Sequence, residues 1–269
     1  MTDFLTIEHV SKQFGGLRAV NQVSFRLEPQ ALAAIIGPNG AGKTTLFNLI
    51  AGALSPTTGT VHFHGKAIRG PLDACRRGIA RTFQNVRLFH RMTVLENVLV
   101  GMSDTSFFHA ALRLPRVVDQ ERLRMKRAYY LLEDVGLEKY AATPAGEIPF
   151  GRQRLLEIAR ALALQPQLLL LDEPAAGLNR TETTALAVLI RRIHAKGIAV
   201  LLIEHDMQMV MRLVEQVIVL DEGQKIAEGT PEIVRADPRV CAAYLGTPVD
   251  SPDTGRQDTG GPTIGAPVC

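Results

Sequence analysis

The residues best suited to chemistry form one glycine-rich segment near the N-terminus, Gly37-Pro38-Asn39-Gly40-Ala41-Gly42-Lys43-Thr44. This segment matches the pattern G-x-x-x-x-G-K-[ST], in which glycines let successive backbone N–H groups turn inward around a phosphate. Lys43 is placed to reach the β- and γ-phosphates of a nucleoside triphosphate, and the Thr44 hydroxyl is placed to hold Mg²⁺. The pattern predicts a nucleoside triphosphate site and no more than that.

Two acidic residues further along the chain could complete such a site. Asp172 and Glu173 directly follow the apolar run Leu168–Leu171. A carboxylate at Asp172 would lie near Mg²⁺, and one at Glu173 could polarise an attacking water as a general base. Two acidic residues can also simply cap the end of a strand. That simpler interpretation is the weaker one because the phosphate-binding pattern is present in the same chain.

Three apolar runs must position these residues: Ala31–Ile36, Leu168–Leu171 and Ile198–Ile203. They lack alternation, which is typical of parallel strands covered on both faces. The first run leads into the glycine-rich segment, and the other two lead to acidic residues or to His205. Ligands of open α/β sheets bind at the carboxyl ends of parallel strands, so these groups are expected at one edge of a sheet.

Weaker patterns complete the expected arrangement. Strands are predicted at Leu5–Val10, Gln22–Leu27 and Thr60–Phe63, and a strand, turn and strand at Val217–Leu220, Asp221–Gly223 and Gln224–Ala227. From about residue 93 to residue 164 the pattern is helical, with a charged amphipathic stretch at Arg122–Val135 and a helix at Arg152–Leu164 that Pro166 stops.

The composition argues against several classes of protein. A formal net charge of +3 and the lack of tryptophan give no support to a nucleic-acid surface. No apolar run reaches the roughly 18 residues that span a bilayer, so a membrane role would need a partner. The N-terminus does not have the pattern of a signal peptide. Residues 247–269 are rich in Pro, Gly, Thr and Asp and are expected to form a disordered tail.

Several further motifs make the chain resemble ABC ATPases from about Leu5 to Gly246. Leu168–Pro174 looks like the Walker B segment of that family. It is preceded at the usual distance by Gly151-Arg152-Gln153-Arg154, which resembles the end of the family signature. Gln84 resembles the Q-loop glutamine that reaches Mg²⁺ and links to the transmembrane partner. Asn179, at the end of Ala176–Asn179, resembles the D-loop residue.

The resemblance assigns a role to each motif residue. His205 resembles the switch histidine that contacts the γ-phosphate and, with Glu173, would be catalytic. Mg²⁺ would be held by Thr44, Gln84 and Asp172. The residues expected to bind ATP are Phe14, which would stack on adenine, and Gly37, Pro38, Asn39, Gly40, Ala41, Gly42, Lys43, Thr44 and Thr45. The five histidines His62, His64, His90, His109 and His194 lack such a context and are expected on the surface.

The resemblance also implies a fold and a set of partners. The expected class is α/β, a RecA-like P-loop NTPase core with a mainly parallel sheet, an N-terminal antiparallel β subdomain and an inserted α-helical signature subdomain. The ATPase domain would span residues 1–246, with the helical insertion at about 88–165. A head-to-tail dimer with an identical or homologous ATPase subunit would place ATP between the P-loop of one chain and Gly151, Arg152, Gln153 and Asn179 of the other.

Membrane subunits follow from the same resemblance. Transmembrane permease subunits would be direct partners, a periplasmic or extracellular solute-binding protein an indirect one, and nucleic acid none. The chain would then lie on the cytoplasmic face of the cell membrane as a peripheral protein. The insertion between Gly101 and Gln120, which contains Phe107 and Phe108, would either pack on its own domain or contact the transmembrane partner.

The signature segment departs from the general ABC pattern. That pattern begins Leu-Ser-Gly-Gly-Gln, whereas Ile148-Pro149-Phe150-Gly151-Arg152 stands here. Pro149 replaces the serine that bonds the γ-phosphate in trans, which leaves Gly151 and the positive end of the next helix. A Pro-aromatic-Gly signature resembles the ATP-binding subunits of branched-chain amino acid importers. Arg152, where that subgroup has Gln, would either reach the partner's nucleotide or face solvent or an acidic residue.

Other functions fit fewer of these residues. A small-molecule kinase would share Gly37–Thr44 but would not need Ile148–Arg154 or His205. A chromosome-maintenance ATPase would carry long coiled coils, and a translation factor of this superfamily would carry two cassettes, but neither feature is present. The ATPase of a lipopolysaccharide-export system is the nearest alternative. The residues around Gly15, Asn179 and the Gly101–Gln120 insertion favour uptake of branched-chain or related hydrophobic amino acids, and the late Tyr244–Gly246 also fits that subgroup.

Overall fold

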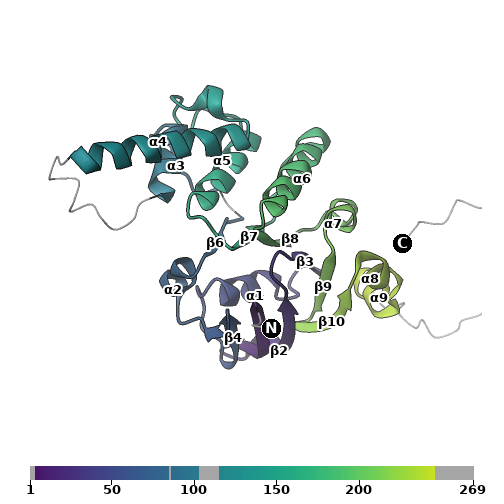
Figure 1. Cartoon of the computed structure of the whole chain (residues 1–269). Coiled ribbons are helices and arrows are strands. Elements are labelled where there is room, and N and C mark those ends of the chain that lie inside the picture. Colours follow the sequence, from purple (N-terminus) through teal and green to yellow (C-terminus); the bar gives the residue numbers. More distant parts are fainter. Residues whose placement is uncertain (1–3, 85, 103–114, 246–269) are drawn as a thin grey trace, which may run out of the picture.

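Two β-sheets, the helices that pack beside them and a separate group of helices make up the described part of the protein (Figure 1). The computed structural model describes residues 4–84, 86–102 and 115–245. The expected tail at 247–269 therefore lies outside the described residues. Phe107 and Phe108 of the predicted insertion also lie outside the described residues. Whether the insertion packs on its own domain or contacts the transmembrane partner therefore stays open.

The N-terminal part forms an antiparallel sheet with the order β2-β1-β4-β5. Its strands are β1 (Leu5–Phe14), β2 (Leu17–Leu27), β4 (Thr58–Phe63) and β5 (Lys66–Ala67). The β1–β2 hairpin runs past the predicted strand ends to a tight turn at Gly15, whose φ of 55° suits glycine. The outer half of the hairpin is largely exposed and carries polar side chains, so no apolar pattern marks it.

The second sheet has the order β10-β9-β3-β8-β7-β6 and is parallel except for the β9–β10 pair. Its strands are β3 (Leu32–Ile36), β6 (Ile79–Arg81), β7 (Leu168–Asp172), β8 (Ala199–Ile203), β9 (Gln216–Asp221) and β10 (Gln224–Gly229). The prediction of three buried parallel strands is confirmed, and β3, β8 and β7 are adjacent. We did not predict β6, which is too short to show a pattern.

Side chains of the parallel strands alternate between two hydrophobic cores. In β7, Leu169 and Leu171 join one core, and Leu168 and Leu170 join the other. Helices α1 (Lys43–Ile50), α6 (Arg180–Ala195) and α7 (Met207–Leu213) supply the covering side chains. Helix α1 packs in the core that the antiparallel sheet shares, and α6 and α7 pack in the other. Both faces are thus buried, which explains why these strands are apolar without alternation.

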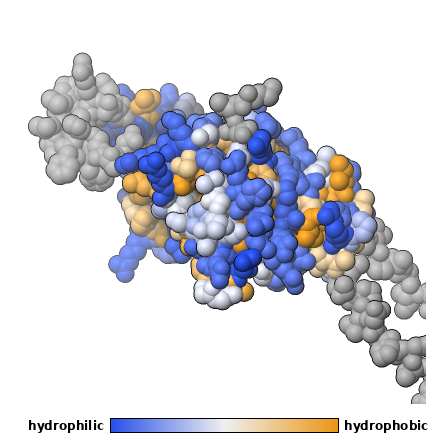
Figure 2. Space-filling view, turned by 90° about the horizontal axis from the view of Figure 1, so that it is seen from below, coloured by the Kyte–Doolittle hydropathy of each residue, from blue (hydrophilic) through white to orange (hydrophobic). Residues whose placement is uncertain are grey.

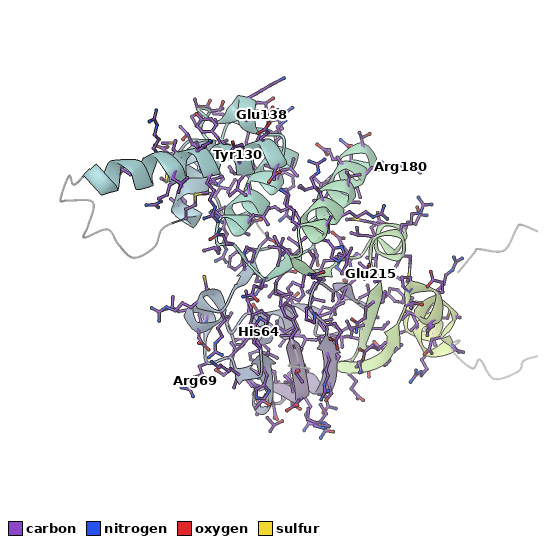
Figure 3. All side chains as sticks on the ribbon, viewed as in Figure 1. His64, Arg69, Tyr130, Glu138, Arg180 and Glu215 are labelled. Carbon is purple, nitrogen blue, oxygen red and sulfur yellow. The ribbon has the colours of Figure 1, made fainter. Side chains whose placement is uncertain are left out.

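The helices between β6 and β7 form a group that stands away from the antiparallel sheet (Figure 1). They are α3 (Val94–Gly101), α4 (Pro115–Asp134), the short 3₁₀ helix η2 (Glu138–Tyr140) and α5 (Phe150–Leu162). Figure 3 shows this separation in the side chains, with Tyr130 and Glu138 in the helical group and His64 and Arg69 in the part below. Helix α5 starts earlier than predicted because Pro149 occupies its N-cap position.

Three short helices lie at the periphery: α2 (Pro71–Arg76), α8 (Pro231–Ala236) and α9 (Pro238–Leu245). The face seen from below is mostly hydrophilic, with small and scattered hydrophobic groups (Figure 2). Within the described ranges, no helix has the length and apolar character needed to cross a membrane.

Candidate nucleotide site

The glycine-rich loop connects β3 to α1 and is fixed by close backbone packing. A Cβ atom at Gly37 would lie 2.0 Å from the Leu220 carbonyl oxygen, and one at Gly42 would lie 2.2 Å from that of Ala19. Gly42 also has a φ of 90°. Only glycine fits at these two positions. The loop therefore holds its shape through contacts with β9 and β2.

Lys43 starts α1 and is almost fully buried beneath this loop. Its Nζ donates to the carbonyl oxygens of Gly37 at 2.8 Å and Pro38 at 2.7 Å. An ammonium group has three donors, so these two bonds leave one for a phosphate oxygen. Burial lowers the pKa of Lys43, and the negative charge of Glu173 opposes that shift. Thr44 is exposed and Thr45 is half-buried at the start of the same helix.

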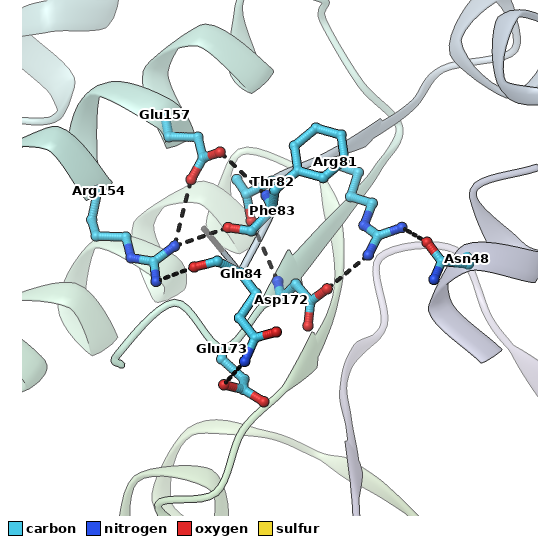
Figure 4. A network of polar contacts seen from close by, with 9 residues as sticks. All are labelled: Asn48, Arg81, Thr82, Phe83, Gln84, Arg154, Glu157, Asp172 and Glu173. Carbon is cyan, nitrogen blue, oxygen red and sulfur yellow. Dashed lines mark hydrogen bonds and ion pairs between the residues drawn. The ribbon is translucent and has the colours of Figure 1, made fainter. Parts of the chain in front are cut away.

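Asp172 ends β7 with its carboxylate buried. Its Oδ2 accepts a hydrogen bond from Arg81 Nη2 at 2.7 Å, and Arg81 Nη1 donates to Asn48 Oδ1 at 2.5 Å (Figure 4). Asp172 Oδ1 is buried and has no hydrogen-bond partner. A buried oxygen without a partner lowers the stability of the fold unless a ligand or a water binds it. Mg²⁺, or a water molecule bound to Mg²⁺, would satisfy this oxygen. The donor set therefore fits a magnesium ion.

The described residues contain no group of three or more His, Cys, Asp and Glu side chains that could hold a metal ion by themselves. A magnesium ion would then depend on few protein ligands together with phosphate oxygens, as is usual for this metal in nucleotide sites. The exposed Thr44 hydroxyl and the Gln84 amide are the neutral candidates that the sequence predicts.

Glu173 brings together residues from three separate motifs. Its Oε1 lies 2.8 Å from His205 Nε2, and its Oε2 accepts a hydrogen bond from Gln84 Nε2 at 2.9 Å. The backbone of Glu173 has a φ of 47°, and its N–H donates to the Ile203 carbonyl oxygen. A non-glycine residue in this left-handed region is strained, and such strain is often found at functional sites. The cluster places a carboxylate between an amide and an imidazole.

Glu204 is a site residue to which the sequence analysis gave no role. Its buried carboxylate accepts hydrogen bonds from the backbone N–H groups of Ala175 at 2.6 Å and His205 at 3.1 Å. Burial raises the pKa of Glu204, and these hydrogen bonds oppose the shift. The contacts tie the loop after β7 to the loop after β8. An acidic residue directly after an apolar strand was the one signal available for it.

The residues expected to act in trans form a second group at the starts of α5 and α6. Asn179 caps α6 through a reciprocal pair of bonds with Glu182, at 3.0 and 2.9 Å. A Cβ atom at Gly151 would lie 2.6 Å from Glu182 Oε1, so the signature segment packs on this cap. Gln153 Nε2 donates to the Ile148 carbonyl oxygen at 3.0 Å.

Arg152 makes a contact that the sequence did not predict. Its guanidinium carbon lies 4.1 Å from the centre of the Tyr140 ring. Among the described residues, this half-buried guanidinium thus has an aromatic contact within its own chain. Whether it also reaches a partner's nucleotide stays a prediction. The sequence could not reveal this contact because Tyr140 is distant along the chain and belongs to η2.

Two aromatic residues border the glycine-rich loop. Phe14 ends β1 with 46% of its surface exposed, and Lys12 Nζ lies 5.2 Å from its ring centre. The hairpin to which Phe14 belongs contacts the loop at Ala19 and Gly42. Tyr244 in α9 lies near the backbone of Gly37, and partial burial raises the pKa of this side chain, which is 43% exposed, to about 12. From the sequence, Tyr244 was known only as a residue that fits the importer subgroup.

Comparison with known proteins points to one family. A family model described as ABC transporter matches residues 20–176, and a second, described as Branched-chain amino acid ATP-binding cassette transporter, matches residues 224–250. The chain is 44% identical, over 90% of its length and 97% of the relative's, to the high-affinity branched-chain amino acid transport ATP-binding protein BraF of Pseudomonas aeruginosa.

Solved structures give the same result. The structure is similar to the ADP conformation of MJ1267, an ATP-binding cassette of an ABC transporter, with a TM-score of 0.79, 32% identity, and coverage of 91% of this chain and 100% of that one. It is also similar to the dimeric structure of MJ0796, a bacterial ABC transporter cassette, with a TM-score of 0.72, 25% identity, and coverage of 85% and 99%. The α/β fold class with a mainly parallel core sheet is thus confirmed.

Proposed function

Since the chain belongs to the ABC transporter family as an ATP-binding cassette, we propose that it hydrolyses ATP and thereby drives uptake of branched-chain or related hydrophobic amino acids through membrane subunits. The observation that carries the catalytic part is the position of the Glu173 carboxylate between His205 Nε2 at 2.8 Å and Gln84 Nε2 at 2.9 Å. A carboxylate held between an imidazole and an amide can accept a proton from water once one of those partners turns to the nucleotide.

The remaining residues bind and orient the substrate. Backbone N–H groups of Gly37–Gly42 and the start of α1 receive the phosphates, and Lys43 supplies a positive charge beside them. Phe14, exposed on the hairpin next to the loop, offers its ring to adenine. Mg²⁺, when bound, neutralises charge on the phosphate oxygens. Asp172, Thr44 and Gln84 are the residues proposed to hold it.

We assign Gly151, Arg152, Gln153 and Asn179 to the nucleotide of a second ATPase subunit. They lie together at the starts of α5 and α6, and the N-terminus of α5 carries a partial positive charge suited to a phosphate. The dimeric cassette to which the chain is similar supports a pair of subunits. Permease subunits would hold this pair at the cytoplasmic face of the membrane, with a solute-binding protein acting on their far side.

The substrate class follows from the similarity to BraF and from the family model that matches residues 224–250. The experiment is uptake of labelled leucine, isoleucine and valine by cells that carry the transporter, with this chain deleted and then restored. Uptake should be lost on deletion, return with the wild-type chain, and stay absent with Glu173→Gln. Unchanged uptake after deletion, or loss of lipopolysaccharide export in its place, would overturn the assignment of the substrate.

A further inference from the structure

Helix α5 carries a buried ion pair for which the nucleotide site offers no direct use. Arg154 is 4% exposed and Glu157 is 2% exposed, and the shortest distance between their charged groups is 3.6 Å. Burial raises the pKa of Glu157, and the charge of Arg154 opposes that shift. Burying two charges is expensive, and an apolar pair of similar size often stabilises a protein equally well. The pair therefore calls for a reason other than packing.

Both side chains are bound to the backbone of the loop that follows β6. Arg154 Nη1 donates to the Phe83 carbonyl oxygen at 2.9 Å, and its Nη2 donates to that of Gln84 at 2.5 Å. The Phe83 N–H donates to Glu157 Oε1 at 3.2 Å (Figure 4). A planar guanidinium is suited to such a forked contact with two consecutive carbonyls, which a lysine cannot reproduce. Three bonds from one helix thus fix two consecutive residues.

The same loop is attached to β7 on its other side. Arg81 pairs with Asp172, the Asp172 N–H donates to Thr82 Oγ1 at 3.3 Å, and the Gln84 side chain reaches Glu173. Figure 4 shows Gln84 with its backbone toward Arg154 and its amide toward Glu173. The position of this amide is therefore set by α5 through two peptide groups. Helix α5 begins at Phe150 and Gly151, where the partner's nucleotide is proposed to bind.

We infer that Arg154 and Glu157 are positioning residues. They hold the backbone of Phe83 and Gln84 against α5, so the position of α5 determines where the Gln84 amide lies relative to Glu173. The inference rests on the proposed hydrolysis at Glu173. A shift of α5 when its N-terminus binds a phosphate would carry the backbone of Phe83 and Gln84 with it, because both buried side chains hold that backbone. Neither Arg154 nor Glu157 needs to touch the nucleotide for this effect.

A double-mutant cycle on the full-length chain tests the inference. Arg154→Lys keeps the charge beside Glu157 but loses the fork, so kcat for MgATP should fall roughly 10-fold while KM changes less than about 2-fold. In the Gln84→Ala background the same change should alter kcat less than about 2-fold, because the residue it positions is gone. A role in stability alone would lower the melting temperature equally in both backgrounds without this coupling.

Arg127→Lys is the matched control, because Arg127 donates to the Ala163 carbonyl oxygen at the opposite end of α5. It should leave kcat and its response to Gln84→Ala unchanged. If Arg154→Lys does not fold, Glu157→Gln replaces it, since the neutral glutamine accepts a weaker hydrogen bond from the Phe83 N–H and loses the charge facing Arg154. That variant should also lower kcat in the wild-type background and change it less than about 2-fold in the Gln84→Ala background.

The outcomes separate this inference from the function on which it rests. If Gln84→Ala by itself leaves kcat unchanged, the proposed role of Gln84 in hydrolysis is wrong, and the inference fails with it. If Gln84→Ala lowers kcat but Arg154→Lys has no effect, or has an equal effect in both backgrounds, the proposed hydrolysis stands and the positioning role is overturned.

Discussion

Glu173 Oε1 and His205 Nε2 lie 2.8 Å apart, although their residues belong to separate strand ends. Strands β7 and β8 are adjacent and parallel, and Asp172 pairs with Ile203 in their register. The residues that follow the two strands therefore emerge side by side at one edge of the sheet. The Glu173 N–H also donates to the Ile203 carbonyl oxygen at 3.0 Å. The contact between the two side chains is thus a consequence of strand order.

Lys43→Ala should weaken nucleotide binding itself. The buried ammonium lies beneath the loop that is proposed to hold the phosphates, and a bond from a charged donor to a phosphate is stronger than a neutral one. We expect the Kd for MgATP to rise about 10-fold or more, measured by titration with a fluorescent ATP analogue. Lys66→Ala, in the exposed strand β5, is the control and should bind normally. An unchanged Kd for Lys43→Ala would argue against a phosphate site at this loop.

Gly42→Ala and Gly40→Ala should differ in their cost to stability. Both positions have φ between 80° and 90°, but a Cβ at Gly42 would meet the Ala19 carbonyl oxygen at 2.2 Å, whereas Gly40 faces open space. Left-handed strain alone costs about 1–2 kcal/mol, which is the loss expected for Gly40→Ala. Gly42→Ala should lose clearly more in urea unfolding without nucleotide. Equal losses would mean that the loop is not packed against β2.

Arg152→Gln tests the contact with Tyr140. If stacking is the main role of Arg152, this variant and Tyr140→Leu should each lower the free energy of unfolding by about 0.5–1 kcal/mol. Their effects should not add, because either change removes the same contact. ATP-driven association with the partner subunit should then stay as in wild type. A weaker association of Arg152→Gln alone would instead favour the role at the partner's nucleotide.

Glu204 should make stability depend on pH. Burial raises the pKa of Glu204 in the folded state, so between the ordinary carboxyl pKa and this raised value the folded protein binds more protons than the unfolded chain. The free energy of unfolding therefore falls as pH rises through that window. Glu204→Gln lacks the titrating group and should show a smaller fall between acid and neutral pH. A steeper fall in the variant would mean that the shift has the opposite sign.

Elements could be predicted from the sequence where a single residue type is required by a single physical cause, such as burial or backbone conformation. Unbroken apolar runs predicted β3, β7 and β8, and the glycine pattern predicted the loop between β3 and α1. The contact between Gln84 and Glu173 could not be predicted from their spacing in the sequence. The resemblance to ABC ATPases nevertheless pointed to both residues. Their catalytic roles, like the domain boundaries at residues 88–165 and 246, stay predictions.

Other features could not be predicted because they depend on tertiary contacts. Strand β6 is short and is defined by its pairing with β7. Arg154 and Glu157 look like an ordinary charged pair on a helix surface, and only the fold shows that they are buried against the loop of Gln84. The stacking of Arg152 on Tyr140 likewise joins two segments whose approach no local pattern encodes.

Steady-state ATP hydrolysis by Glu173→Gln measures whether the Glu173 carboxylate acts as the general base. Glutamine keeps the size of the side chain but removes the carboxylate that is proposed to accept a proton from water. Turnover should fall by about 10²-fold or more, while the Kd for MgATP stays within about 2-fold of wild type and ATP-dependent dimers persist. A variant that hydrolyses ATP at nearly the wild-type rate would show that Glu173 is not the general base.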